Sequence, residues 1–152
     1  MRVAEIMTKA TVTDSHSGTL QAAAEIMWRQ QTGSIVIVEG GELVGIVTER
    51  DVLKVVASGQ DVAKTVVGDV MTTGVITVGP DTPIRDAART MAQHWIRHLP
   101  VVADGELVGI ISQRDVTGIF AALWRDAGFP EIDTDSLVRA RRLERLEPGD
   151  LD

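Results

Sequence analysis

Hydrophobic and polar positions alternate with two different periods along the chain, and the changes of period predict helices and strands. Apolar residues recur three and four positions apart over residues 20–27 and 84–95, the spacing of a helix with one buried face. Short runs rich in β-branched residues follow each of these segments and are typical of strands. The predicted strands span 34–39, 43–48, 99–103 and 107–112, and further helices are predicted at 49–57 and 113–123.

Local signals predict how these elements begin and how they are connected. Gly40-Gly41 and Asp104-Gly105 separate the paired runs, and both favour a tight hairpin turn, which needs positive φ at its central residues. Thr82-Pro83 predicts a good helix start, with a hydroxyl cap followed by proline at the first helical position, whereas Gly18-Thr19 is a weaker start. Short extended segments are expected before these helices, at 11–13 and 75–78.

The same order of elements occurs twice, because the sequence repeats itself at an offset of 64 residues without a gap from Val3 to Ala57. The offset aligns Met7-Thr8 with Met71-Thr72, and it aligns the segment GELVGI at 41–46 with 105–110. Each copy is expected to fold as strand–helix–strand–strand–helix. A unit of about 60 residues buries little apolar surface alone, so an α+β fold with the two copies packed sheet to sheet is expected.

This repeat divides the chain into three predicted parts. Residues 1–60 hold the first motif, residues 61–125 the second, and residues 126–152 an extension that we expect to be partly helical or disordered. The extension is acidic, with eight acidic and four basic residues. An amphipathic helix after Asp135-Ser136 would pack on its own domain or contact a subunit or a regulated partner.

Composition narrows the possible functions. The 152 residues carry a formal net charge of −7 and only 3% aromatic residues, which argues against nucleic-acid binding. No apolar run approaches the roughly 20 residues that span a bilayer, and the chain does not begin with a signal peptide, so a cytoplasmic protein without membrane contact is expected. The absence of cysteine excludes disulfides and thiolate metal sites.

The segment from Gly45 to Asp51 carries candidate binding chemistry. Gly45 leaves room for close approach by another group, and Asp51 follows Thr48 by three residues in the first helical turn. A carboxylate there can accept hydrogen bonds from both hydroxyls of a ribose, while Arg50 and the helix start can attract a phosphate. The same pattern is also a capping box, which satisfies free backbone N–H groups without any ligand, and one pair of side chains can serve both roles.

The segments GIVTERDV at 45–52 and GIISQRDV at 109–116, together with the repeated Met-Thr pair and the glycine-containing hairpins, resemble the CBS domain. Two such units in tandem resemble a CBS pair, also called a Bateman module. The resemblance implies a regulatory module that binds adenosine-containing ligands such as AMP, ADP, ATP, NAD or S-adenosylmethionine between its copies. It also implies association of two chains, so a homodimer is expected.

The resemblance assigns each cleft to the [Ser/Thr]-x-x-Asp segment of one copy and the strand starts of the other. The first cleft is expected to use Thr48, Arg50, Asp51, Val75, Ile76, Thr77, Arg97, His98, Leu99 and Pro100. The second is expected to use Ser112, Arg114, Asp115, Thr11, Val12, Thr13, Ser34, Ile35 and Val36. Apolar side chains and main-chain groups of the strand starts would hold the adenine.

The two clefts differ in charge. Arg97 and His98 supply cations beside the expected phosphate position of the first cleft, whereas residues 32–36 supply none to the second. The first cleft is therefore expected to bind phosphate better. Gln113 in place of Glu49 acts against this ranking, because it lowers the negative charge of the second cleft.

Two other classes of function remain open. A metal or redox sensor would use His94 and His98, whose i,i+4 spacing could hold a metal on a helix. This helix is expected to end near Trp95 or Ile96, so we predict no metal site. A dimerisation module with empty clefts would use Thr48/Asp51 and Ser112/Asp115 only as helix caps. Neither a phosphate loop nor a nucleophile elbow is present, so no catalytic residue, no enzyme activity and no required cofactor are predicted.

Overall fold

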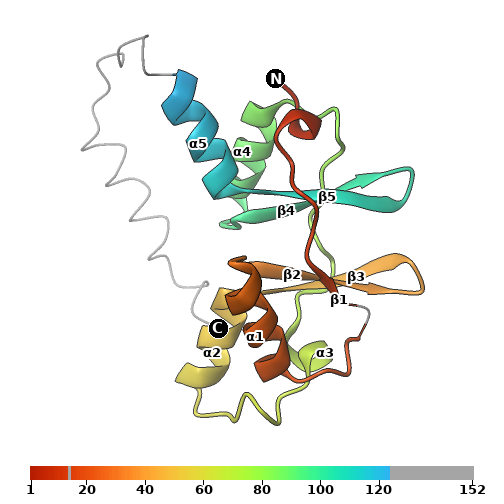
Figure 1. Cartoon of the computed structure of the whole chain (residues 1–152), viewed down its shortest axis with the longest axis vertical. Helices are drawn as coiled ribbons and strands as arrows, with labels where there is room; N and C mark the ends of the chain where they lie inside the picture. Colours follow the sequence, from red (N-terminus) through yellow and green to blue (C-terminus); the bar gives the residue numbers. More distant parts are fainter. Residues whose placement is uncertain (14, 124–152) are drawn as a thin grey trace. The chain divides into compact units, whose positions relative to one another are not determined.

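The computed structural model describes residues 1–13 and 15–123, which hold both copies of the repeat (Figure 1). The first copy contains a 3-10 turn η1 (Val3–Glu5), β1 (Val12–Thr13), α1 (Leu20–Gln30), β2 (Ser34–Glu39), β3 (Glu42–Thr48) and α2 (Glu49–Ala57). The second contains α3 (Val67–Val70), α4 (Ile84–Gln93), β4 (His98–Ala103), β5 (Glu106–Ser112) and α5 (Gln113–Leu123). The predicted extension at 126–152 lies outside the described residues.

The strands form two small sheets with equivalent hairpins. The order is β1-β2-β3 in one sheet and β4-β5 in the other, with β1 parallel to β2 and both hairpins antiparallel. Gly40 and Gly41 have φ of 59° and 88°, and Asp104 and Gly105 have φ of 52° and 85°. The predicted tight turns with positive φ are therefore confirmed in both copies.

The second copy does not complete the predicted extended segment at 75–78. Only Val78 is paired there, through a parallel bridge to Val101, whereas the first copy forms the short strand β1 at the equivalent place. The Val78 N–H donates to the Pro100 carbonyl at 3.1 Å, and the Val102 N–H donates to the Val78 carbonyl at 2.9 Å. The expected strand is thus reduced to a single bridge, although its direction is the one that the repeat requires.

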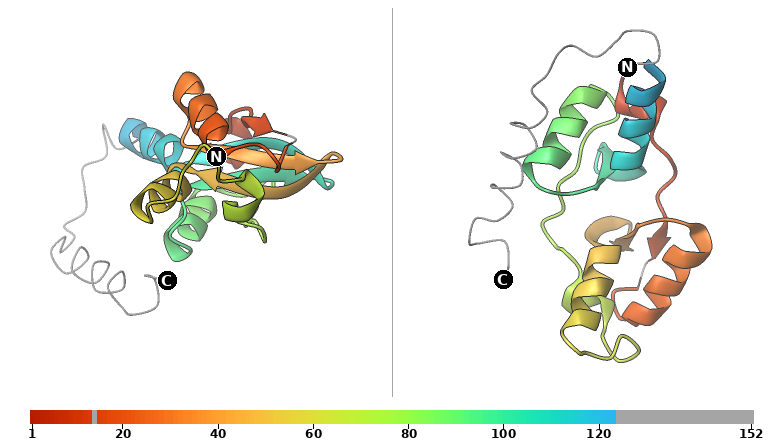
Figure 2. Two further views of the ribbon diagram at one scale, coloured as in Figure 1. Left: turned by 90° about the horizontal axis from the view of Figure 1, so that it is seen from below. Right: turned by 90° about the vertical axis from the view of Figure 1, so that its left-hand side faces the viewer.

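Successive residues of β2 face two different neighbours. Ile35 and Ile37 pack with α1 and α2 in the core of the first copy. Val36 points the other way and packs with Ile46 of β3 and Ile110 of β5. Both faces of the sheet are therefore buried, one under helices and one against the second sheet, as Figures 1 and 2 show. The sheet-to-sheet α+β fold predicted from the repeat is confirmed.

The segments that lead into each copy cross to the other copy. The Val3 N–H donates to the Thr82 carbonyl at 2.9 Å, and Thr8 forms an antiparallel bridge with Ile110 of β5. In the opposite direction, Thr72 forms a bridge with Ile46 of β3, and Val67 is buried in the core of the first copy. Figure 1 shows the two crossing segments between the sheets. The division of the chain near residue 60 stays a prediction.

These crossings explain two glycines of the repeat. A Cβ on Gly45 would lie 2.5 Å from Met71 Sδ and 3.2 Å from the Thr72 carbonyl oxygen. A Cβ on Gly109 would lie 2.9 Å from both Met7 Sδ and the Thr8 carbonyl oxygen. The group that needs the space beside Gly45 is therefore the Met-Thr segment of the other copy.

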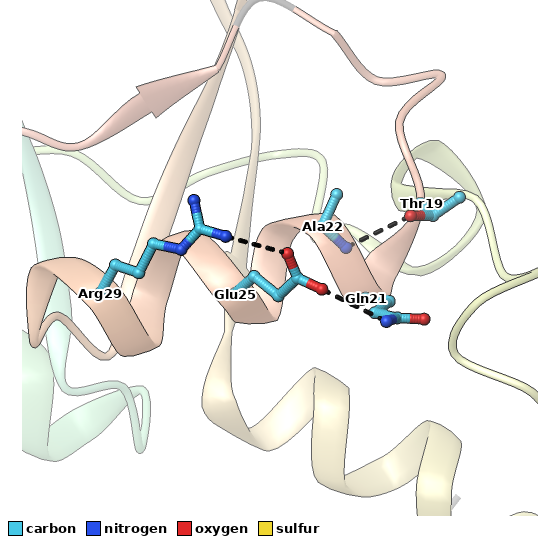
Figure 3. Close-up of polar contacts among 5 residues, drawn as sticks. All are labelled: Thr19, Gln21, Ala22, Glu25 and Arg29. Atoms are coloured by element: carbon cyan, nitrogen blue, oxygen red, sulfur yellow. Dashed lines mark hydrogen bonds and ion pairs between the residues drawn. The ribbon is translucent and has the colours of Figure 1, made fainter.

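The starts of α1 and α4 do not follow the order of capping strength that the sequence predicts. Thr19 caps α1, because its side chain accepts a hydrogen bond from the Ala22 N–H at 3.2 Å (Figure 3). Pro83 is the N-cap of α4 rather than its first helical residue, and Thr82 makes no side-chain cap there. Pro83 occupies the position of Thr19 in the repeat, and its side chain has no acceptor. The start predicted to be weaker is the one with the hydroxyl cap.

The end of α4 also lies earlier than expected. The helix ends at Gln93, His94 is its C-cap, and Trp95 has a left-handed φ of 55°. His94 and His98 therefore do not share one helix, since His98 begins β4. Within residues 1–13 and 15–123, no helix has the length and apolar character that crossing a membrane requires.

Candidate functional site

Each of the helices α2 and α5 begins with a hydroxyl and a carboxylate joined by short hydrogen bonds. The Thr48 Oγ1–H donates to Asp51 Oδ2 at 2.9 Å, and the Thr48 N–H donates to the same oxygen at 2.7 Å. The Ser112 Oγ–H and N–H donate to Asp115 Oδ2 at 2.6 and 2.7 Å. The capping role is therefore present in both copies.

The caps use only one oxygen of each carboxylate. Within the described part of the chain, no hydrogen bond or ion pair engages Oδ1 of Asp51 or Asp115. Both residues are half-buried. An unused carboxylate oxygen at a helix start can accept a hydrogen bond from a ligand hydroxyl while the cap stays intact.

The strand register brings four polar residues to the margin of the face where the sheets meet. Ser34 is paired with Thr48 across the first hairpin, and His98 is paired with Ser112 across the second. Because side chains alternate along a strand, Ser34 shares the face of Val36, which belongs to the apolar cluster between the sheets. We call Ser34, Thr48, His98 and Ser112 the polar margin.

Ser34 is the buried member of the polar margin. Its side chain is 1% exposed, and its Oγ has no hydrogen-bond partner among the residues that the structure describes. Buried hydroxyls without a partner are uncommon and unfavourable, because the hydroxyl gives up its hydrogen bonds to water without replacing them. A ligand or water molecule at the polar margin would satisfy this group.

Charged residues of the two copies meet beside the polar margin. Arg97 Nη2 lies 3.8 Å from Glu49 Oε2, and Arg50 Nη1 donates to the Trp95 carbonyl at 3.4 Å. The His98 ring lies against Gly33, where an added Cβ would be 3.1 Å from its Cε1. We call Glu49, Arg50 and Arg97 the charged cluster.

Burial and charge both act on His98. Desolvation lowers the pKa of its imidazole, and the neighbouring Arg97 adds to this effect. Glu49 and Asp115 oppose the shift, and Arg114 lowers the pKa slightly further. Since the net shift is downward from about 6.5, His98 is neutral at pH 7. It therefore offers a hydrogen bond rather than a full positive charge to a ligand.

The other predicted site residues occupy different places. Ile35 and Leu99 are fully buried, and Ile35 packs with α1 and α2. Val75 packs against the apolar cluster between the sheets. The remaining predicted residues are Thr11 directly before β1, Val12 and Thr13 in β1, Ile76 and Thr77 between α3 and α4, Pro100 in β4, and Arg114 in α5. The Thr11 Oγ1–H donates to Gln30 Oε1 at 2.8 Å.

The structure brings together only some of the expected partners. Arg97 and His98 lie beside the start of α2, as the first predicted cleft requires. Among the described residues, no hydrogen bond or ion pair joins Ile76 or Thr77 to Thr48 or Asp51. The composition of the two clefts stays a prediction.

The sequence-based list omitted Glu49 and Gly33. Glu49 contacts Arg97, and its N–H donates to the Gly33 carbonyl at 3.1 Å. The sequence signal that could have pointed to Glu49 is the difference between the copies, since the equivalent position of the second copy holds Gln113. Among the described residues, no group of three or more histidine, cysteine or acidic side chains is placed to hold a metal ion.

Comparison with known proteins agrees with the repeat. The family model "CBS domain" matches residues 3–58 and again 67–122. The chain is 40% identical over 115 residues to the CBS domain-containing protein YhcV of Bacillus subtilis. The aligned region covers 75% of this chain and 81% of YhcV.

Two solved structures with bound ligands have the same fold. The CBS domain pair of protein MJ0100, in complex with 5-methylthioadenosine and S-adenosyl-L-methionine, has a TM-score of 0.73 and 29% identity, covering 81% of this chain and 98% of that one. The CBS domain protein PAE2072 from Pyrobaculum aerophilum, complexed with AMP, has a TM-score of 0.70 and 29% identity, covering 80% and 99%. The duplicated sequence, the two stacked sheets and the family match agree: the chain belongs to the CBS-domain family and contains a CBS pair.

Proposed function

We propose that this protein is a regulatory module that binds an adenosine-containing ligand between its two CBS motifs and has no catalytic role. The observation that carries the proposal is the repeated arrangement at the starts of α2 and α5. In each, a hydroxyl and a carboxylate are held 2.6 to 2.9 Å apart, and one carboxylate oxygen has no partner among residues 1–13 and 15–123. The ligands named for MJ0100 and PAE2072 contain adenosine, which supports the same ligand class here.

The chemistry of the residues suggests their roles. Asp51 and Asp115 would accept hydrogen bonds from the ribose hydroxyls, and Thr48 and Ser112 would hold these carboxylates in place. The unpartnered hydroxyl of Ser34 would gain a hydrogen bond at the polar margin. The backbone of the strand starts would contact the adenine. The ligand therefore acts as a regulatory signal rather than as a cofactor.

Ligand binding would be transmitted through the packing of the two motifs. Glu49 and Arg50 of α2 contact Arg97 and the Trp95 carbonyl of the second copy, so a ligand at this position touches both copies. A ligand that prefers one relative packing shifts the population toward it. A partner protein that distinguishes the two packings would read the signal.

A dimerisation module is the second candidate. Leu53 and Val56 lie three residues apart on α2 and are 66% and 57% exposed, and Trp28 on α1 is 78% exposed. Exposed apolar side chains on one pair of packed helices favour association of two chains. A homodimer is compatible with both candidates, because ligand binding and association use different surfaces.

A thermal-shift and calorimetric panel of AMP, ADP, ATP, NAD, methylthioadenosine and S-adenosylmethionine tests the proposal. We expect at least one ligand to stabilise the protein. Asp51→Asn should weaken binding at its site about 10- to 100-fold, because a charge-assisted hydrogen bond is lost. Asp61→Asn is the matched control, since Asp61 also accepts a backbone hydrogen bond, from Ala63 at 2.9 Å, but lies in another segment. No response to any ligand, with a stable dimer in light scattering, would favour the dimerisation module.

A further inference from the structure

One ion pair at the charged cluster joins the start of α2 to the start of β4. Glu49 Oε2 lies 3.8 Å from Arg97 Nη2, and the side chains are 62% and 49% exposed. The position of Glu49 is also fixed from its other side. Its N–H donates to the Gly33 carbonyl at 3.1 Å, and its carboxyl carbon would lie 3.3 Å from a Cβ placed on Gly33. Glu49 therefore contacts residues of both copies.

The repeat makes this ion pair specific to one half of the molecule. The offset of 64 residues aligns Glu49 with Gln113 and aligns Arg97 with Gly33. The start of α5 therefore has neither the carboxylate nor the facing cation. Glu49 also follows Thr48 directly in the sequence, two residues before the proposed ribose contact at Asp51.

A carboxylate at this position acts against a phosphate in two ways. It neutralises Arg97, the cation that a phosphate of the ligand would otherwise use, and it repels the phosphate directly. His98 does not replace that charge, because burial lowers the pKa of its imidazole. An adenosine ligand without phosphate meets no such competition, since its ribose and adenine need neither Arg97 nor a positive potential.

We propose that Glu49 is a specificity-determining residue of the Thr48/Asp51 site. By holding Arg97, it lowers the affinity for phosphorylated adenosine ligands relative to phosphate-free ones. The inference rests on the proposed function, because it assumes that an adenosine-containing ligand binds at this helix start. It goes further by stating which chemical group of the ligand is selected and which side chain selects it.

Calorimetric titration of AMP and methylthioadenosine into the wild-type protein and Glu49→Gln tests the inference. We expect Glu49→Gln to bind AMP about three- to tenfold more tightly, while the affinity for methylthioadenosine changes less than about twofold. The variant gives the first copy the residue that the second copy has at position 113.

Glu25→Gln is the matched control, because it removes the same charge from a similar ion pair. Glu25 lies on α1, 3.5 Å from Arg29, and its side chain is 52% exposed (Figure 3). We expect this variant to leave both affinities unchanged. An equal gain in AMP affinity in Glu25→Gln would overturn the inference, since the effect would then come from net charge alone.

A double-mutant cycle identifies the residue through which Glu49 acts. Arg97→Gln should lower the affinity for AMP. In the Arg97→Gln background, Glu49→Gln should raise the AMP affinity by less than it does in the wild-type protein. The gain should persist in Asp115→Asn and disappear in Asp51→Asn, which assigns it to the first site. A gain of equal size with and without Arg97 would contradict the proposed role of the ion pair.

The outcomes of these experiments separate a failure of the proposed function from a failure of the proposed role of Glu49. If none of the six ligands of the panel binds the wild-type protein, the proposed function is wrong. If AMP and methylthioadenosine both bind and Glu49→Gln leaves the ratio of their affinities unchanged, the proposed function stands and the role of Glu49 is wrong. Thermal unfolding of each variant without ligand shows whether the fold is intact before affinities are compared.

Discussion

Gly45 and Gly109 show how one missing side chain connects the two motifs. Their Cα atoms face the Met-Thr segment of the other copy, and a methyl group at either position would enter that segment. The nearest atom to a Cβ on Gly45 belongs to the flexible Met71 side chain, whereas Gly109 is equally close to the Thr8 backbone. Backbone cannot move aside as a side chain can, so the cost should be larger at Gly109.

Gly109→Ala should therefore destabilise the protein by about 1–3 kcal/mol in urea unfolding, and by more than Gly45→Ala does. Gly118→Ala is the control, because an added Cβ there meets nothing within 4 Å and the residue lies in α5. Alanine at that position should stabilise the protein by about 0.5–1 kcal/mol. Equal stability of the Gly109→Ala variant and the wild type would show that the crossing segment is not tightly packed.

His98 should make stability depend on pH near neutrality. The folded chain lowers the pKa of this imidazole, so the unfolded chain binds a proton more readily. The contribution to stability is complete above about pH 6.5 and is lost as the pH falls through the folded-state pKa. The groups that act on the imidazole are Arg97, Glu49, Asp115 and Arg114.

The free energy of unfolding of the wild type should fall more steeply between about pH 7 and pH 5.5 than that of His98→Gln. Both proteins share the same carboxylates, so their titration cancels in the comparison. Identical pH profiles would mean that His98 titrates alike in the folded and unfolded chains.

At the scale of elements, the equivalent helices α1 and α4 differ in how their first turns are capped. Thr19 caps α1 through its side chain, while at the equivalent position Pro83 offers only its carbonyl. The first N–H of each helix donates to a leading segment, that of Leu20 to the Thr65 carbonyl at 2.8 Å and that of Ile84 to the Met1 carbonyl at 3.3 Å. This tertiary contact is common to both copies, and the side-chain cap of α1 is added to it.

Thr19→Ala should destabilise the protein by about 1 kcal/mol, because the Ala22 N–H loses its acceptor. Thr19→Ser keeps the hydroxyl and should retain most of the stability. Chemical denaturation measures both variants. A loss in Thr19→Ser as large as in Thr19→Ala would assign the effect to the methyl group of the threonine rather than to the cap.

At the scale of the whole molecule, the crossing segments make each motif depend on the other. Val67 belongs to the second sequence repeat but is 2% exposed within the core of the first. Residues Met1–Gly118 form one compact unit that contains both sheets. Unfolding of the two motifs should therefore be a single cooperative transition.

Val67→Ala should lower the free energy of unfolding by about 1–3 kcal/mol, since a buried side chain loses two methyl groups. Hydrogen exchange should show equal losses of protection in β2 and β4, although the substitution contacts only the first core. Val62→Ala is a milder control, because Val62 packs against the same core but is only partly buried. A loss of protection confined to β2 would show that the motifs unfold independently.

The sequence by itself determined the duplication, the helices and hairpin strands that recur in both copies, both hairpin turns and the positions of the two carboxylates. These depend on local causes: apolar spacing, the positive φ that Gly40-Gly41 and Asp104-Gly105 provide, and the short distance from hydroxyl to carboxylate within one helical turn. The capping role of Asp51 and Asp115 could be derived from the four-residue segments 48–51 and 112–115 alone.

Only the tertiary structure decided which groups meet across the repeat. The crossing of the leading segments, the burial of Val67 in the other copy, the unpartnered Ser34 and the pairing of Glu49 with Arg97 join residues distant in the sequence. Such contacts follow from how the two sheets pack on one another, and no local pattern encodes them. The proposed selection of a ligand at the start of α2 would depend on these contacts, because the charge available to a phosphate there is set by residues of both copies.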